Sequence, residues 1–238
     1  MTEEREPDPD PWPQLPASWS GPADGGVDCL CVRLGDVAAA AQLQSVVTPQ
    51  EAVRAGAFRA PGDRKRALVA RAALRLLLTR CTGDGEPGAI PITTGQHGKP
   101  MLAGGPQFNL SHGGDVVLFA FAAVDPVGVD VEPHSSGVAR LEVVHRLQWE
   151  ERAMIEQASN KNDAFLRVWT RKEAVAKARG VGVFGMDIEF EAAPYAQSDT
   201  GFGFEWSIHD LRPAPRHIGA LATTTRAPPR FWRYTPEG

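Results

Sequence analysis

Residues 127–132 alternate strictly between valine and a polar or small residue, and this alternation constrains the fold more than any other stretch. A two-residue period is typical of a β-strand with one buried face. Asp130 and Glu132 would share the other face, about 6–7 Å apart along the strand. Two carboxylates this close repel each other unless a cation lies between them. The pattern therefore fits either a solvated acidic face or a site for a hard cation such as Mg²⁺, which one or two carboxylates usually hold.

A second stretch, residues 165–177, has apolar residues at helical spacing. Glu173 and Lys177 lie one turn apart on one face of this predicted helix, and Trp169 lies on the same side. One interpretation is a surface ion pair, which contributes little to stability. The other is a third carboxylate for the cation and an ammonium group for phosphates that the cation binds.

The two stretches resemble motifs of the 4′-phosphopantetheinyl transferase family, specifically its monomeric surfactin-synthetase-activating type. The family pattern G-[IV]-D-x-E occurs at residues 128–132, and W-[ST]-x-K-E-[SA]-x-x-K occurs at residues 169–177. Gly98-Lys99-Pro100 and Phe108-Asn109-Leu110-Ser111-His112 precede them in the family's order. A looser similarity extends from about Thr48 to the predicted C-terminal strands.

The resemblance implies transfer of the 4′-phosphopantetheine arm of coenzyme A to a serine of an apo acyl- or peptidyl-carrier protein, with release of 3′,5′-ADP. It implies that Asp130, Glu132 and Glu173 hold Mg²⁺. Glu173 would also be the base, directly or through a metal-bound water. Lys177 would neutralise phosphate oxygens, and His112 would hydrogen-bond the pyrophosphate.

Further coenzyme A contacts are implied for Lys99 and Ser111, at the nucleotide end, and for Arg54 and Arg66, at the 3′-phosphate. A position near Phe58 that is often basic in the family is Ala57 here, and Arg59 is a possible substitute.

One further family glutamate belongs at the start of the preceding helix, where Glu150 and Glu151 both qualify. We expect Lys172 to support the fold rather than the reaction.

Predicted strands and helices alternate in two similar sets, which favours an α+β protein. The resemblance implies two similar subdomains in a pseudo-dimeric arrangement, with the active site in the cleft between them. We expect a disordered N-terminal tail at residues 1–26, an N-terminal subdomain at 27–126 and a C-terminal subdomain at 127–238. The tail is rich in Pro, Asp, Glu and Gly, although Trp12 and Trp19 could dock on the body.

Strands are predicted at residues 27–34, 107–110, 116–123, 127–132, 187–192, 204–209 and 218–223, and helices at 38–43, 48–58, 64–80, 138–147, 150–157 and 165–177. Thr48 and Glu51 have the spacing of a capping box, and Asp63 is the predicted cap of the next helix. Asp125-Pro126 is predicted to turn the neighbouring strands into a hairpin. The G-x-G-x-x-G match at Gly180 follows a helix, so we interpret Gly180 as a helix C-cap and not as part of a dinucleotide site.

Composition limits the remaining possibilities. The net charge of −4 does not suggest a nucleic-acid surface, and no apolar run is as long as a membrane span. The acidic, Pro-rich start does not resemble a signal peptide. Three cysteines suit neither a complete disulfide set nor a zinc site. We therefore expect a cytoplasmic protein. The resemblance implies that it is a monomer.

Two alternatives stay open beside the transferase. The same carboxylates could serve a magnesium-dependent nucleotide-pyrophosphate hydrolase, or the chain could be a non-catalytic module that binds coenzyme A or a carrier protein. The carrier's pathway, whether fatty acid, polyketide or non-ribosomal peptide synthesis, and its docking surface also stay open.

Overall fold

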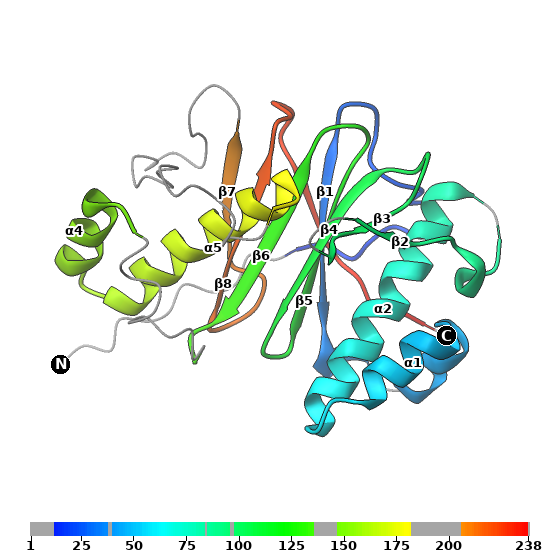
Figure 1. Ribbon diagram of the computed structural model, residues 1–238. Helices are drawn as coiled ribbons and strands as arrows, with labels where there is room; N and C mark the ends of the chain where they lie inside the picture. Colours follow the sequence, from blue (N-terminus) through cyan, green and yellow to red (C-terminus); the bar gives the residue numbers. More distant parts are fainter. Residues whose placement is uncertain are drawn as a thin grey trace.

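The computed structural model describes residues 12–37, 40–83, 85–95, 98–135, 147–181 and 206–237. Within these ranges two β-sheets lie between two long helices, as Figure 1 shows. The first sheet has the strand order β4-β5-β1-β9 and the second has the order β6-β8-β7. A separate two-stranded sheet consists of β2 (Thr93–Thr94) and β3 (Pro100–Met101).

The first sheet contains β1 (Val27–Arg33), β4 (Gln107–Gly113), β5 (Val116–Ala122) and β9 (Arg230–Arg233). Helix α2 (Pro61–Thr82) covers its outer face. Leu74 and Leu78 of this helix belong to one core cluster with Phe119 and Phe121 of β5. The short helix α1 (Pro49–Gly56) packs beside α2.

The second sheet contains β6 (Val127–Pro133), β7 (Ser207–Leu211) and β8 (His217–Thr223). Helix α5 (Lys161–Arg179) packs on its outer face, and α4 (Trp149–Gln157) packs against α5. The inner faces of the two sheets share a core in which Cys31 and Leu118 meet Val129 and Leu221. The protein therefore has four layers, and the α+β prediction is confirmed.

The predicted hairpin between residues 116–123 and 127–132 is wrong. Strand β5 pairs with β4 on one edge and with β1 on the other, so neither edge is left for β6. Strand β6 pairs with β8 and begins the second sheet. Its polar face is also buried, because α5 covers it, so β6 is not the half-exposed strand that the alternation suggests.

The predicted disorder is wrong for residues 12–26. Trp12 and Trp19 are buried, and the indole Nε1 of Trp19 donates to Asp28 at 2.9 Å. The Leu15 amide donates to the Arg233 carbonyl, so this segment lies along the C-terminal strand. Composition alone missed these partners because it does not pair Trp19 with Asp28, and because Arg233 is distant in sequence from Leu15. Residues 1–11 lie outside the described residues.

The C-terminal strand β9 pairs in parallel with β1 of the first sheet. The last part of the expected C-terminal subdomain thus returns to the N-terminal half. No local period predicted β9, which is only four residues long.

Helix termini follow the predicted chemistry with one exception. Thr48 and Glu51 form the capping box of α1, and Gly180 ends α5 in the left-handed conformation, with φ of 73°. Asp63 does not cap α2, which begins at Pro61 with Ala60 as its N-cap. Proline suits the first helical turn because its missing N–H would have no helical partner there.

The remaining predicted elements can be compared only in part. The short helix near residue 40 is a 3₁₀ helix, Ala40–Ser45, and the expected strand at 204–209 starts later, at Ser207. The helix predicted at 138–147 lies, apart from its last residue, outside the described residues, as does the strand predicted at 187–192. Among the helices that the structure describes, none is long and apolar enough to cross a membrane.

Candidate active site

Helix α5 and strand β6 are in direct backbone contact at Gly128. A Cβ atom at this position would lie 2.0 Å from the Ala174 carbonyl oxygen and 2.4 Å from the Ala178 amide nitrogen. Only glycine permits an approach this close. The contact brings Glu173 and Lys177, the neighbours of these two alanines in α5, over the strand that carries Asp130.

Asp130 is the centre of a hydrogen-bonded triad with Ser111 and Lys177. Its Oδ1 accepts from the Lys177 ammonium at 2.6 Å and from the Ser111 hydroxyl at 2.8 Å. The ammonium also donates to the Ser111 oxygen at 3.0 Å. Three elements that are distant in sequence, β4, β6 and α5, thus meet at one carboxylate that is 3% exposed.

The other oxygen of Asp130, Oδ2, is buried and has no hydrogen-bond partner among the described residues. Buried polar atoms rarely lack a partner, so such an atom calls for an explanation. A carboxylate oxygen only accepts, and its natural partners are a hydrogen-bond donor or a cation.

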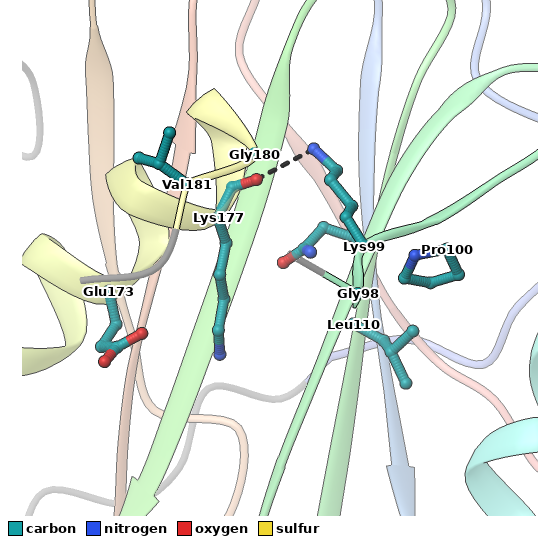
Figure 2. A pocket seen from close by; sticks show the side chains of 9 residues that line it. Gly98, Lys99, Pro100, Leu110, Glu173, Lys177, Gly180 and Val181 are labelled. Atoms are coloured by element: carbon teal, nitrogen blue, oxygen red, sulfur yellow. Dashed lines mark hydrogen bonds between the residues drawn. The ribbon is translucent and has the colours of Figure 1, made fainter. Parts of the chain in front are cut away.

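Glu173 lies close enough to interact electrostatically with the carboxylates of Asp130 and Glu132. Burial, together with the charges of Asp130 and Glu132, raises its pKa to about 7, and Lys177 opposes the shift. In Figure 2 the Glu173 and Lys177 side chains extend from α5 toward the same side. The structure therefore brings the three predicted carboxylates into one negatively charged region.

The donor set fits Mg²⁺, although the protein alone does not build a complete cage. Among the described residues, no three His, Cys, Asp or Glu side chains form a ready metal-binding group. Mg²⁺ usually keeps several waters and binds one or two carboxylates together with substrate phosphates. The orphaned Oδ2 of Asp130 and the carboxylate repulsion at Glu173 are what such a cation would relieve.

A pocket of about 260 Å³ adjoins these residues (Figure 2). Its lining comes from both halves of the protein: Gly98, Lys99, Pro100, Asn109, Leu110, Glu173, Lys177, Gly180 and Val181. Glu173 and Lys177 thus link the acidic region to a cavity open to a ligand.

Lys99 lines this pocket and also ties the two halves together. Its Nζ donates to the Lys177 carbonyl at 2.9 Å, the contact dashed in Figure 2, and to the Val127 carbonyl at 3.4 Å. Burial lowers the pKa of Lys99. An ammonium group is favourable here because carbonyl groups at a helix C-terminus carry partial negative charge.

His112 and Arg66 lie on the α2 side of β4. Arg66 donates to the Gly114 carbonyl at 2.7 Å, in the turn between β4 and β5, and it pairs with Asp63. His112 is open to solvent, but partial loss of hydration lowers its pKa and the Arg66 charge lowers it further. Lys177 acts in the same direction and Asp130 opposes it, so His112 lies within electrostatic reach of the triad.

Arg54 belongs to a different group of charges. It is exposed on α1, near Arg71 of α2. Burial lowers the pKa of Arg71, Glu51 opposes this shift, and the charges of Arg75 and Arg54 add to it. Arg75 forms a 2.6 Å ion pair with Glu51. The contacts of the described residues thus place Arg54 with this network, and Arg66 with the turn after β4.

The structure separates the roles of Glu150 and Glu151. Glu151 is fully buried, forms a 3.0 Å ion pair with Lys172 and accepts from the Gln148 amide at 2.8 Å. Glu150 is only partly buried, in the first turn of α4. The ion pair joins α4 to α5, which is consistent with the prediction that Lys172 supports the fold or the helix end.

Two residues in this region were not singled out from the sequence. Asn109 accepts from the Val129 amide at 2.9 Å, and Gly128 allows the helix contact described above. The sequence feature that could have identified Asn109 is its position two residues before Ser111, because residues two apart in a strand have side chains on the same face.

Comparison with known proteins yields two family matches. A model described as the 4′-phosphopantetheinyl transferase superfamily matches residues 126–225. A model described as the N-terminal part of 4′-phosphopantetheinyl transferase matches residues 37–124.

Individual relatives carry the same description. The chain is 30% identical over 204 residues to the 4′-phosphopantetheinyl transferase HetI of Nostoc sp., an alignment that covers 81% of this chain and 85% of HetI. It is 32% identical over 166 residues to the L-aminoadipate-semialdehyde dehydrogenase-phosphopantetheinyl transferase of Xenopus laevis, and this alignment covers 62% of this chain and 55% of that relative. It is 32% identical over 99 residues to the 4′-phosphopantetheinyl transferase ffp of Bacillus subtilis, and this alignment covers 40% of this chain and 43% of that relative.

Proposed function

This chain belongs to the 4′-phosphopantetheinyl transferase superfamily and transfers phosphopantetheine to carrier proteins, and we propose that it does so with Mg²⁺ held by Asp130, Glu132 and Glu173. These three residues are called the acidic cluster below. Coenzyme A supplies the arm, a serine of an apo acyl- or peptidyl-carrier protein accepts it, and 3′,5′-ADP leaves.

The observation that carries the metal proposal is the buried Oδ2 of Asp130, which has no partner among the described residues. The neighbouring Glu173 supports it, since its raised pKa reflects burial and carboxylate repulsion. A bound magnesium ion would supply positive charge to both groups and to the pyrophosphate of the substrate.

In the reaction, the serine oxygen attacks the β-phosphorus of coenzyme A, and the bond from that phosphorus to the bridging oxygen breaks. Glu173 accepts the proton of the serine hydroxyl. Glu173 lines the pocket, and a carboxylate positioned within hydrogen-bond reach of the hydroxyl can act as a general base. The proton passes from the serine to Glu173, and the negative charge passes to the leaving 3′,5′-ADP.

Lys177 and His112 stabilise charge on the phosphates. The Lys177 ammonium, already held between Asp130 and Ser111, is positioned to interact with a phosphate oxygen bound beside the acidic cluster. Partial burial and the Arg66 charge lower the pKa of His112, which favours the neutral imidazole. A neutral imidazole can donate one hydrogen bond, and its acceptor here is the pyrophosphate.

Coenzyme A binding extends from the acidic cluster in two directions. Lys99 and Ser111 lie at the nucleotide end, Lys99 in the wall of the pocket and Ser111 beside Asp130. Arg66 lies on the far side of His112 and binds the 3′-phosphate. Arg54 contributes to that contact only if its side chain leaves the neighbourhood of Arg71.

The chain acts as a monomer of the surfactin-synthetase-activating type. Support comes from the site itself, because one chain supplies Ser111 and His112 from the first half and Asp130 and Glu173 from the second. The proposed location is the cytoplasm, where reduced thiols such as the buried Cys29 and Cys31 are stable. The proposed partners are carrier proteins and not nucleic acid or membranes.

Mass spectrometry of apo carrier proteins incubated with coenzyme A tests the proposal. We expect the phosphopantetheine mass to appear with Mg²⁺, to vanish with EDTA and to return when Mg²⁺ is restored. Asp130→Asn should abolish transfer while the fold persists, and the exposed Asp24→Asn should behave as the parent. Full transfer in EDTA would refute the metal role.

A second measurement separates the transferase from the hydrolase. Without a carrier, the transferase should release 3′,5′-ADP slowly or not at all. Rapid release from coenzyme A alone would identify water as the nucleophile.

A further inference from the structure

Strands β4 and β6 lie next to each other at the site but belong to different sheets (Figure 1). Each is the edge strand of its sheet, with β5 as the partner of β4 and β8 as the partner of β6. Backbone ladders within the described sheets therefore do not fix how β6 sits against β4. Side-chain hydrogen bonds and close packing at glycine contribute instead.

Three alternate residues of β4 meet three consecutive residues of β6. Asn109 Oδ1 accepts from the Val129 amide at 2.9 Å, and the Ser111 hydroxyl donates to Asp130 at 2.8 Å. A Cβ on Gly113 would lie 2.6 Å from the Val131 carbonyl oxygen. Because alternate residues of a strand share a face, this face of β4 as a whole is fitted to the strand that carries Asp130.

We propose that Asn109 is a positioning residue for the acidic cluster: by accepting from the Val129 amide, it fixes Asp130 relative to Ser111 and Lys177. The two residues in contact are almost fully buried, Asn109 at 5% and Val129 at 0% exposure. Val129 directly precedes Asp130, so a shift of that peptide moves the carboxylate. The catalytic part of this inference rests on the proposed magnesium role of Asp130.

The contact also explains why an amide suits this position. The Val129 amide can only donate, so Oδ1 of Asn109 has to face it, and the Nδ2 group has to point the other way. Asn109 lines the pocket that also contains Glu173. An aspartate would keep the acceptor for Val129 but would add a negative charge beside the acidic cluster.

Hydrogen exchange of the Val129 amide, measured by NMR on labelled protein, tests the contact without metal or carrier. Asn109→Leu keeps the size of the side chain and removes the acceptor, so exchange at Val129 should become about tenfold faster or more. Gln107→Met changes an exposed amide on the same strand and should leave Val129 unchanged. Unchanged exchange in Asn109→Leu would overturn the inference.

Magnesium titration by calorimetry, with coenzyme A present and no carrier, tests the consequence for the cluster. The apparent dissociation constant of Mg²⁺ should rise about tenfold in Asn109→Leu, a factor that loss of an outer-shell partner commonly costs a metal site. Asn109→Asp retains the acceptor oxygen and should keep this constant no higher than in the parent. An unchanged constant in Asn109→Leu, or an equal rise in Asn109→Asp, would refute positioning.

Two controls keep the outcome decisive. If Asn109→Leu does not fold, Asn109→Ser replaces it, because serine is too short to reach the Val129 amide and adds no apolar bulk. If the parent itself binds no Mg²⁺, the proposed magnesium role fails, and Val129 exchange alone decides on Asn109. Faster exchange then supports the contact, and unchanged exchange overturns it.

Discussion

Gly128→Ala is the most direct perturbation of the contact that assembles the site. The added Cβ would lie 2.0 Å from the Ala174 carbonyl oxygen and 2.4 Å from the Ala178 amide nitrogen, whereas real Cβ contacts essentially never fall below 3.0 Å. Both obstructing atoms are backbone atoms, so no side chain can rotate away. Helix α5 has to move away from β6 by about 1 Å, the difference between the observed and the permitted distance.

The expected losses of stability and of rate follow from this displacement of α5. Overpacking in a filled core typically costs about 1–3 kcal/mol, and a clash with backbone should lie at the upper end. For a chain of this size, about 3 kcal/mol lowers the melting temperature by roughly 6–12 °C. Glu173 and Lys177 move with α5, and a misplacement of about 1 Å can lower a rate about 100-fold.

Thermal unfolding and carrier modification kinetics of the same variant provide the assay. We expect Gly128→Ala to remain folded at 25 °C, to melt earlier and to lose about 100-fold in kcat/KM. Gly62→Ala is the matched control, because nothing lies within 4 Å of its added Cβ. Parent-like melting and parent-like kinetics in Gly128→Ala would refute the proposed contact between α5 and β6.

Three further predictions concern charges. Because burial and its acidic neighbours raise the pKa of Glu173 from 4.5 to about 7, the metal-free protein should lose stability as the pH rises from 4.5 to about 7. A metal-free Glu173→Gln protein that kept this pH dependence of unfolding would contradict the assignment to Glu173. Lys172→Met leaves Glu151 buried without the Lys172 ammonium, so the free energy of unfolding in urea should fall by about 3–5 kcal/mol. The double variant Lys172→Met/Glu151→Leu should largely recover this loss. Equal instability of the two proteins would mean that the broken ion pair is not the cause. Arg66→Ala should weaken the binding of coenzyme A by about 1.5–3 kcal/mol, seen mainly as a higher KM, and should barely change the kinetics with dephospho-coenzyme A. Equal losses for both donors would assign Arg66 a structural role.

The sequence by itself determined the parts of the site that depend on short-range periodicity. The two-residue period placed Asp130 and Glu132 on one face, and the helical period did the same for Glu173 and Lys177. The capping box at Thr48 and the helix end at Gly180 were equally predictable. In each case the interacting groups lie within a few residues of each other in the sequence, so the local pattern is sufficient to predict their arrangement.

Only the tertiary structure decided which distant elements meet. It placed β5 and β6 in different sheets, returned β9 to the first sheet and buried Trp19 against Asp28. It also distinguished Glu151 from Glu150, since only the packing of α4 on α5 brings Lys172 to one of them. An edge strand can accept many partners with similar backbone hydrogen bonds, so the choice depends on which arrangement buries both faces of each sheet.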